Sequence, residues 1–367
     1  MKFDVDSLVI EEGSRDTPLA RRLIRSLAAV PVRYVDDARE ATRPQLGPDP
    51  FAAGKRRVVV MKRRTPFLMA CPAGSAKFAC CGYLVLVLAS NCPMDCSYCF
   101  LQEHVANNPA FQIYSNYGDS FEELDRLARS APGRHFRVGT GELADSLAMD
   151  SITGLSRDLI EFVREHEHLT LELKTKTDEI GNLLKIDPRG RVLVSWTLSP
   201  GALWKSSEHR TASPSGRIAA ARAVLDAGYR VGFHFDPMVA YENAEHDYGL
   251  LLDELLSTIP ARSISFVSMG ALRMTPELRN AARKRFPEDP MLLGEEVLGN
   301  DGRLRAFSAL RVRLYRALQE RFSRGGAQIP SYLCMESGVV HERVFGVAPA
   351  NPATIGERLA LGPGTDL

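Results

Sequence analysis

Short apolar runs alternate with segments of helical periodicity from residue 83 onward. The runs are six to eight residues long and rich in β-branched residues, and they predict strands. Strand–helix alternation of this kind indicates βα units around a parallel sheet, and six units are fewer than the eight of a closed barrel. The pattern therefore favours an α/β fold with a partial, TIM-like (β/α)6 barrel. The expected strands cover 83–89, 135–140, 169–175, 191–198, 229–235 and 263–270, and the expected helices cover 119–131, 151–166, 177–186, 215–228 and 248–259.

The rest of the chain is expected to form extensions around this barrel. Residues 1–80 lack a clear period, hold one short helical pattern, and are interpreted as an N-terminal extension or lobe. The barrel itself takes 81–275. Residues 276–345 add a helix and a short strand that complete the domain, and the Pro/Gly-rich residues 346–367 form a tail.

The composition is that of a globular protein and does not by itself indicate a function. The 367 residues are 45% hydrophobic and 25% charged, as in ordinary globular proteins. No apolar run approaches twenty residues, so no membrane span is expected. The N-terminus carries acidic residues where a signal peptide would be basic and then apolar, which predicts a cytoplasmic protein. In that compartment a cluster of cysteines more often binds metal or acts in catalysis than forms disulfides.

Three cysteines stand within eight residues directly after the first expected strand. Cys92, Cys96 and Cys99 have three and two residues between them. Barrel enzymes place their chemistry at the carboxyl ends of their strands, where this loop is expected. A structural zinc ion would need a fourth ligand, from His104 or from Cys80 or Cys81. A 4Fe–4S cluster held by three thiolates would instead leave one iron open for a small molecule.

The cysteine spacing resembles that of the radical S-adenosylmethionine (SAM) enzymes. Tyr98 stands before the last cysteine, as an aromatic residue does in their C-x3-C-x-aromatic-C motif. The resemblance implies a 4Fe–4S cluster whose open iron chelates the methionine part of SAM, and a 5′-deoxyadenosyl radical released by one electron. The end of the second expected strand, Gly139-Thr140-Gly141-Glu142, resembles the Gly-Gly-Glu motif that holds the SAM ammonium in this superfamily.

Several longer stretches resemble the spore photoproduct lyase family, in the same order, over roughly residues 55 to 340. That family repairs 5-thyminyl-5,6-dihydrothymine in DNA by abstracting a hydrogen atom, splitting the bond between the thymines and returning a hydrogen atom. The resemblance implies DNA and an electron donor such as flavodoxin or ferredoxin as partners. The alternative is the same scaffold acting on another substrate, a modified nucleoside or a small metabolite. Among these stretches are "LELKTK", "VSWTLSP", "SFVSMGALRMTPEL" and "YLCMES".

The resemblance also assigns roles to single residues. Lys176 and Ser195 would contact the methionine carboxylate of SAM, and Tyr98 would pack on the cluster and on SAM. His234 would touch the ribose, and Arg273 would meet a phosphate or the SAM carboxylate. By itself, Lys176 also fits a solvated lysine at a strand end, and His234 fits a buried histidine bonded to a neighbour.

One feature of the family is missing from the expected place. The family's lyases return the hydrogen atom from a cysteine beyond the second strand, a position that falls near Glu142 in this chain. No cysteine occurs between Cys99 and Cys334. A carboxylic acid cannot replace the thiol, because its O–H bond is too strong to give hydrogen to a carbon radical. Another thiol must serve, or the chemistry differs.

Three further cysteines precede the first expected strand. Cys80 or Cys81 could be the hydrogen donor, the two could bind a second metal with Cys71, or all three could be packing residues. We expect the three to be grouped together, and at a distance from SAM, because barrel strands begin at the end opposite the active site. Cys334 is interpreted as a buried small hydrophobe.

Two basic stretches are candidates for binding DNA phosphates. A charge run is usually a solvated surface, so either stretch alone is a weak signal, but a DNA enzyme needs only a local basic face and not a basic total. The candidate residues are Lys55, Arg56, Arg57, Lys62, Arg63 and Arg64 in the first stretch, and Arg279, Arg283, Lys284 and Arg285 in the second.

Overall fold

A curled sheet of parallel strands forms the centre of the computed structural model, which describes residues 3–71, 78, 81–324 and 329–347. Within these ranges the sheet has the order β18-β14-β13-β11-β10-β9-β5-β4, in which only β4 is antiparallel to its neighbour. Its central six strands are the expected partial barrel, so the predicted fold class is confirmed. The strands are β4 (Leu68–Ala70), β5 (Leu84–Leu86), β9 (Phe136–Gly139), β10 (Leu169–Thr175), β11 (Val192–Thr197), β13 (Arg230–Met238), β14 (Ile264–Ala271) and β18 (Ser331–Leu333).

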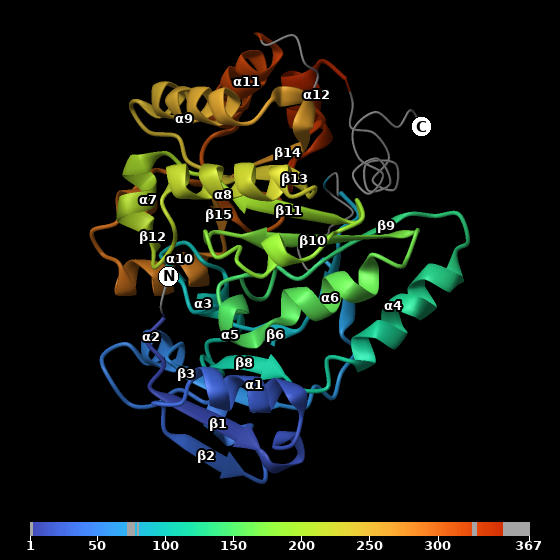
Figure 1. The fold of residues 1–367 in the computed structure, drawn as a ribbon. Helices are drawn as coiled ribbons and strands as arrows, with labels where there is room; N and C mark the ends of the chain where they lie inside the picture. Colours follow the sequence, from blue (N-terminus) through green and yellow to red (C-terminus); the bar gives the residue numbers. More distant parts are fainter. Residues whose placement is uncertain (1–2, 72–77, 79–80, 325–328, 348–367) are drawn as a thin grey trace.

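Helices follow most of these strands and cover the outside of the sheet (Figure 1). Most of them bury apolar side chains, as Leu251, Leu252 and Leu255 show for the long helix after β13. They are α4 (Asp119–Ser130), α5 (Asp150–Thr153), α6 (Leu155–Val163), α8 (Pro214–Asp226), α9 (Ala244–Thr258), α11 (Ser308–Arg324) and α12 (Gly338–Phe345). None of the helices that the structure describes is long and apolar enough to cross a membrane.

The helix predicted over 177–186 is wrong. Only a 3-10 turn forms there, η3 (Leu183–Lys185). The Trp196 indole donates a hydrogen bond to the Thr177 carbonyl at 2.9 Å, and the Thr177 hydroxyl accepts from the Glu179 amide at 3.1 Å. The Thr177 carbonyl thus accepts from Trp196 and not from the Gly181 amide, as it would in a helix beginning there, and the segment stays a loop.

A second sheet, at the bottom of Figure 1, lies in the N-terminal part of the chain. Among the described residues its order is β2-β1-β3-β8-β6, with α1 (Pro18–Ser26) packed on it through Leu19 and Leu23. The expected strand 83–89 is therefore divided, because its end joins this second sheet as β6. The strands are β1 (Ser7–Glu11), β2 (Val32–Val35), β3 (Arg57–Met61), β6 (Ala89–Ser90) and β8 (Phe111–Tyr114).

Short elements surround the carboxyl ends of the barrel strands. The cysteine loop contains β7 (Asp95–Cys96). This strand pairs with β12 (Glu208–His209), which lies much later in the sequence. A small antiparallel sheet of β15 (Arg273–Met274), β17 (Leu304–Arg305) and β16 (Val297–Leu298) follows the last barrel strand. The helices here are α2 (Pro50–Gly54), α3 (Leu101–His104), α7 (Gly201–Ser207) and α10 (Pro276–Arg285).

Gly139, at the end of β9, makes a testable packing prediction. A Cβ atom there would lie 1.9 Å from the Tyr83 hydroxyl, inside a buried part of the sheet. We expect Gly139→Ala to lower the free energy of unfolding by about 1–3 kcal/mol, because the Tyr83 ring must move. Urea unfolding measures this. Gly181→Ala, at a position with open space around it, is the matched control, and an equal loss in both variants would contradict the prediction.

Candidate active site

A cavity of about 650 Å³ opens at the carboxyl ends of the barrel strands. Its volume is in the range of small-molecule and cofactor sites. The wall combines sulfur, cationic and carboxylate groups that come from segments far apart in the sequence. Among the lining residues are Cys92, Cys96, Tyr98, Cys99, Gly141, Glu142, Asp145, Lys174, Lys176, Thr197, Asp236, Arg273 and Cys334.

The three cysteines of the loop all face this cavity. Cys92 and Cys96 are buried, and Cys99 is partly exposed. Burial raises the pKa of the Cys92 thiol to about 12, so a thiolate there needs a neighbouring cation such as iron. In the described part of the chain, no three Cys, His, Asp or Glu side chains could hold one metal ion together. A 4Fe–4S cluster has no such requirement, because each thiolate binds a different iron.

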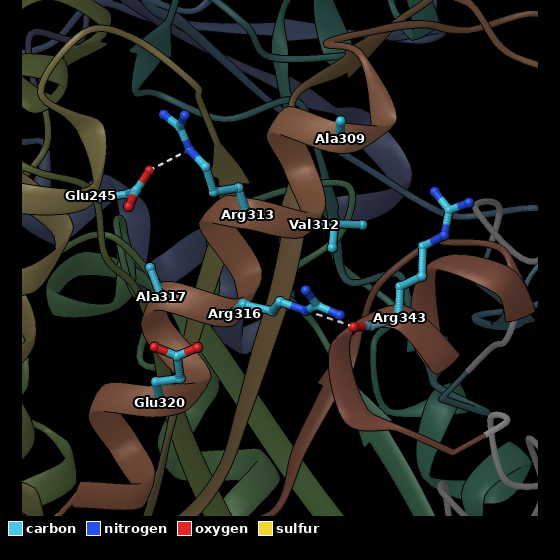
Figure 2. Close-up of a pocket in the computed structure, with 8 residues that line it drawn as sticks. All are labelled: Glu245, Ala309, Val312, Arg313, Arg316, Ala317, Glu320 and Arg343. Carbon is cyan, nitrogen blue, oxygen red and sulfur yellow. Dashed lines mark hydrogen bonds and ion pairs between the residues drawn. The ribbon is translucent and has the colours of Figure 1, made fainter.

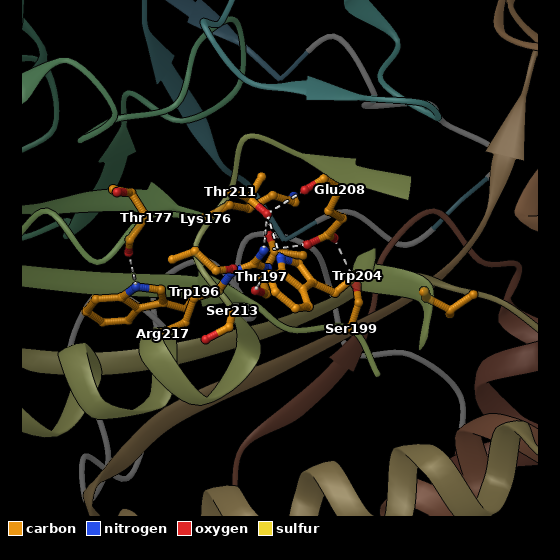
Figure 3. Close-up of polar contacts among 12 residues, drawn as sticks. Lys176, Thr177, Trp196, Thr197, Ser199, Trp204, Glu208, Thr211, Ser213 and Arg217 are labelled. Carbon is orange, nitrogen blue, oxygen red and sulfur yellow. Dashed lines mark hydrogen bonds and ion pairs between the residues drawn. The ribbon is translucent and has the colours of Figure 1, made fainter. Parts of the chain in front are cut away.

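A buried ion pair fixes the cysteine loop to the barrel (Figure 3). Arg217 on α8 and Glu208 on β12 are both 0% exposed at the side chain and lie 2.6 Å apart. The other oxygen of Glu208 accepts hydrogen bonds from the Tyr98 hydroxyl at 2.5 Å and from Ser199 at 2.9 Å. Arg217 also donates to the Thr197 carbonyl at 2.8 Å. Tyr98 is therefore held by a strand and a helix that follow it by more than 100 residues.

The opposite side of the loop is held through Asp95. The Arg285 guanidinium donates to Asp95 at 2.8 Å, and the Lys55 ammonium lies 3.3 Å from the same carboxylate. Lys55 also donates a short hydrogen bond to the Met94 carbonyl. The loop thus lies between Lys55, which directly follows α2, and the last turn of α10.

Two ionic groupings line the wall of the cavity. Arg273 donates two hydrogen bonds to Asp236, at 2.9 and 3.0 Å. Burial opposes ionisation of Asp236, but Arg273 lowers its pKa. Burial raises the pKa of Glu142, while Lys174 opposes the rise. Burial in turn disfavours the charged Lys174, but Glu142 and Asp236 raise its pKa. The charges on this wall therefore compensate one another.

Asp145 positions the lysine that was predicted to bind SAM. Its carboxylate accepts from the Lys176 amide at 2.7 Å and from the Thr175 hydroxyl at 2.7 Å. The Lys176 ammonium lies 5.7 Å from the centre of the Tyr98 ring, within range of a cation–π interaction. The end of β10 and the loop after β9 are thus locked together beside the cysteines.

The two predicted glycines have different surroundings. Gly141 lines the cavity, and a Cβ on it would lie 2.5 Å from Lys174 Cβ and 2.8 Å from the Lys174 carbonyl oxygen. Gly139 lies deeper, against Tyr83. Close packing within the protein accounts for the absence of a side chain at both positions.

Ser195 and His234 lie in a buried cluster beneath the cavity. The Ser195 hydroxyl donates to Glu172 at 2.6 Å, His234 Nε2 lies 3.0 Å from the same oxygen, and Arg137 lies 3.4 Å from the other. Burial disfavours the charge on Glu172, but Arg137 and His234 lower its pKa to about 2. Thr197, two residues beyond Ser195 on β11, is the hydroxyl-bearing residue of this strand on the cavity wall.

The expectation that Cys71 lies at a distance from the candidate site is wrong, because it is on the cavity wall. Cys71 and Cys334 line the cavity, whereas Cys81 lies 3.0 Å from the buried Arg137 guanidinium. Cys80 lies outside the described residues, so its expected role as a donor stays a prediction. The interpretation of Cys334 as core packing is wrong, because its side chain faces the cavity and is partly exposed.

Both basic stretches are largely structural, which corrects their interpretation as phosphate-binding patches. Lys55 and Arg57 are buried, and Arg57 donates to the Ala41 carbonyl at 2.6 Å. Arg279 pairs with Glu296 at 2.7 Å, and Arg285 is bound to Asp95. The cations of these stretches that stay exposed to solvent are Lys62, Arg64 and Lys284.

A second hollow, of about 560 Å³, lies on the outside between α9, α11 and α12 (Figure 2). Its ionic groups largely bind each other. Arg313 lies 2.5 Å from Glu245, and Arg316 donates to the Arg343 carbonyl at 2.7 Å. With none of the loop cysteines in its wall, it is not the candidate active site.

Some of the site residues that the sequence did not reveal follow a pattern. Glu172 and Lys174 occupy alternate positions of β10, in phase with the predicted Lys176 just beyond its end, and alternate positions point to the same side of a sheet. Polar residues at such positions of an apolar strand are a signal that could have identified Lys174. Glu208 and Arg217 carry no comparable signal, because their pairing depends on the tertiary fold.

The fold and the cysteine-lined cavity together define the class of a radical SAM enzyme. A family model described as spore photoproduct lyase matches residues 46–300. The spore photoproduct lyase of Clostridium acetobutylicum is 25% identical over 296 residues, 79% of this chain and 85% of that protein. The lyase of Bacillus subtilis is 24% identical over 210 residues, 57% of this chain and 61% of that protein. The chain belongs to the spore photoproduct lyase family.

Solved structures agree in fold. A spore photoproduct lyase mutant with bound AdoMet and dinucleoside spore photoproduct superposes with a TM-score of 0.79 at 21% identity, covering 91% of this chain and 99% of that one. Another, complexed with dinucleoside spore photoproduct, has a TM-score of 0.80 at 20% identity and covers 91% and 100%. The protein is thus a spore photoproduct lyase-like radical SAM enzyme.

The Arg217–Glu208 pair can be tested by a double-mutant cycle. Arg217→Met leaves a buried carboxylate without its cation, and we expect it to lower the free energy of unfolding by about 3–5 kcal/mol. Adding Glu208→Gln should recover part of the loss, so the double variant costs less than the sum of the single ones. Urea unfolding gives all four values. Arg222→Met, an exposed residue on the same helix, is the control, and strict additivity would contradict the coupling.

His234 predicts a pH dependence. Burial lowers its pKa to about 4, so the folded protein keeps it neutral while the unfolded chain binds a proton below about 6.5. Stability should therefore fall as the pH drops from about 6.5 to 4, by up to about 3 kcal/mol from this residue. Urea unfolding of His234→Gln across this window should give a shallower slope than wild type. Equal slopes would mean that His234 binds its proton equally well in the folded and in the unfolded chain, and His246→Gln controls for loss of an exposed imidazole.

Proposed function

We propose that this chain cleaves spore photoproduct, the thymine dimer 5-thyminyl-5,6-dihydrothymine, in DNA. The observation that carries the proposal is the convergence of the three loop cysteines, Lys176 and Glu142 on one cavity, in a chain of this family. Related enzymes have been solved with AdoMet and dinucleoside spore photoproduct. Thiolates of a cluster need a reducing compartment, which supports the cytoplasm as the location.

In this proposal Cys92, Cys96 and Cys99 hold a 4Fe–4S cluster with one iron left for SAM. The bound pair supplies a 5′-deoxyadenosyl radical once a donor such as flavodoxin or ferredoxin provides an electron. The residues present fit these groups, because three thiols line one cavity and a thiolate there needs a cation for stability.

The chain's own polar residues bind and orient SAM. The Lys176 ammonium, which lies over the Tyr98 ring, pairs with the methionine carboxylate of SAM. The Glu142 carboxylate pairs with the ammonium group of SAM. The Thr197 hydroxyl takes the contact that had been expected of Ser195. Ser195 and His234 act as positioning residues under the cavity, and Arg273 keeps Asp236 ionised.

The lesion would reach the cavity as a dinucleotide taken out of the DNA helix, because the reacting atoms are inaccessible within a stacked duplex. Phosphate contacts would come from cations that the fold leaves exposed, such as Lys62, Arg64 and Lys284, and not from the two stretches as wholes. Recognition would depend on the damaged shape of the DNA more than on its sequence.

The residue at the position of the family's donor cysteine favours a difference in chemistry from related lyases. Glu142 stands near the position where the family resemblance places the donor cysteine, and it faces the cavity. We therefore propose that the chain diverges from related lyases in its hydrogen donor. The alternative is a radical SAM enzyme acting on a modified nucleoside or a small metabolite.

The test is anaerobic incubation of reconstituted enzyme with SAM, dithionite and DNA irradiated with ultraviolet light at low water content. We expect release of 5′-deoxyadenosine and restoration of thymine, and loss of both by at least a hundredfold in each single alanine variant at Cys92, Cys96 and Cys99. Iron content should fall in the same variants. 5′-Deoxyadenosine formed without consumption of the lesion would favour the alternative substrate, and activity retained in a cysteine variant would contradict the cluster assignment.

A further inference from the structure

Cys334 is a thiol at the catalytic end of the barrel that no role described so far uses. It directly follows β18, and its amide donates to the Met269 carbonyl of β14 at 2.7 Å. Its backbone is therefore fixed near the carboxyl end of β14, close to where Arg273 and Asp236 meet. The side chain faces the same cavity as the three loop cysteines.

The sulfur of Cys334 is held in place by an immobilised cation. The Arg273 guanidinium lies 3.6 Å from Sγ, and two hydrogen bonds to Asp236 fix that guanidinium in turn. Arg273 also donates to the Met335 sulfur at 2.9 Å. The cavity is the side from which a ligand can reach this thiol.

Cys334 also has the chemical form that hydrogen-atom transfer needs. Burial raises its pKa above the ordinary value, and Asp236 adds to the rise while Arg273 opposes it, so the group stays a thiol near neutral pH. A hydrogen-atom donor must carry the S–H bond. The loop cysteines must instead become thiolates to bind iron.

The other described cysteines are less well placed. Cys71 follows β4, and its amide donates to the Tyr83 carbonyl, just before β5 begins. Cys81 also precedes β5 and lies against the buried Arg137. The backbones of both therefore lie at the amino end of the first barrel strand, whereas chemistry in such barrels takes place at the carboxyl ends. Cys71 also lines the cavity, but unlike Cys334 it does not follow the carboxyl end of a barrel strand.

We propose that Cys334 is the hydrogen-atom donor to the substrate radical, an inference that rests on the proposed function. The S–H bond breaks homolytically, a C–H bond forms on the thymine carbon that carries the unpaired electron, and a thiyl radical is left on Cys334. One electron from the same class of one-electron reductant and one proton from water then restore the thiol.

The experiment compares wild type with Cys334→Ala and Cys334→Ser in D2O. Thiol protons exchange with solvent, so wild type should place one deuterium in the thymines restored from each lesion. Both variants should still consume the lesion and release 5′-deoxyadenosine, but yield of deuterated thymine should fall at least tenfold, with dithionite adducts in its place. The serine variant keeps the size of the side chain but has an O–H bond too strong to donate.

A second readout does not depend on turnover. Cys334 should be alkylated by N-ethylmaleimide in the reconstituted enzyme, and saturating SAM with the dinucleotide lesion should slow this at least tenfold; an unchanged rate would overturn the placement. The proposal would be overturned if Cys334→Ala still gave deuterated thymine without adducts. It would also be overturned if dithionite adducts formed with Cys71→Ala and not with Cys334→Ala. A wild type that leaves the lesion intact while cleaving SAM would instead overturn the proposed function, and the inference with it.

Discussion

The contact between Arg217 and Glu208 organises the site, because it joins the cysteine loop to the middle of the barrel. Both side chains are fully buried, so the pair is stable only when every remaining donor and acceptor is satisfied. Arg217 meets this condition through two backbone carbonyls and Thr211, and Glu208 through Tyr98 and Ser199. Any displacement of the loop would break several charge-assisted bonds at once. The loop can therefore present three thiols in a fixed arrangement although its own regular structure is only two residues of strand.

The polar residues inside the barrel also form layers in which buried charges compensate one another. Glu172, Ser195 and His234 form one layer under the cavity, and residues further along the strands, such as Lys174 and Asp236, form the next. Charges inside a barrel are expensive to desolvate, so each layer compensates its own ions before any ligand arrives. The lower layer acts as a rigid base, and the upper one offers partly compensated charges to a zwitterionic ligand such as SAM.

The sequence-based predictions were accurate where local sequence decides the structure, and failed where contacts between distant segments decide it. The barrel strands were predictable because each is an apolar run of its own, and 169–175 matches β10 residue for residue. The segment 177–186 was not, because a bond from Trp196 decides its conformation. The cysteine spacing identified the loop without any tertiary information. Glu208 lies 112 residues after Cys96 and yet pairs with it, and only the folded chain brings such residues together.

The two basic stretches show why charge alone is a poor guide to partners. Lys55 and Arg285 look like phosphate ligands in the sequence, but the fold uses both to neutralise Asp95 in the cysteine loop. A partly buried carboxylate next to a cluster of thiols would otherwise be unfavourable, since thiolates are also negatively charged. These cations therefore contribute to the chemistry by stabilising the loop. In the proposed function, contacts with DNA would then depend on the shape of the cavity entrance and on isolated exposed cations, which suits an enzyme that recognises damage and not a base sequence.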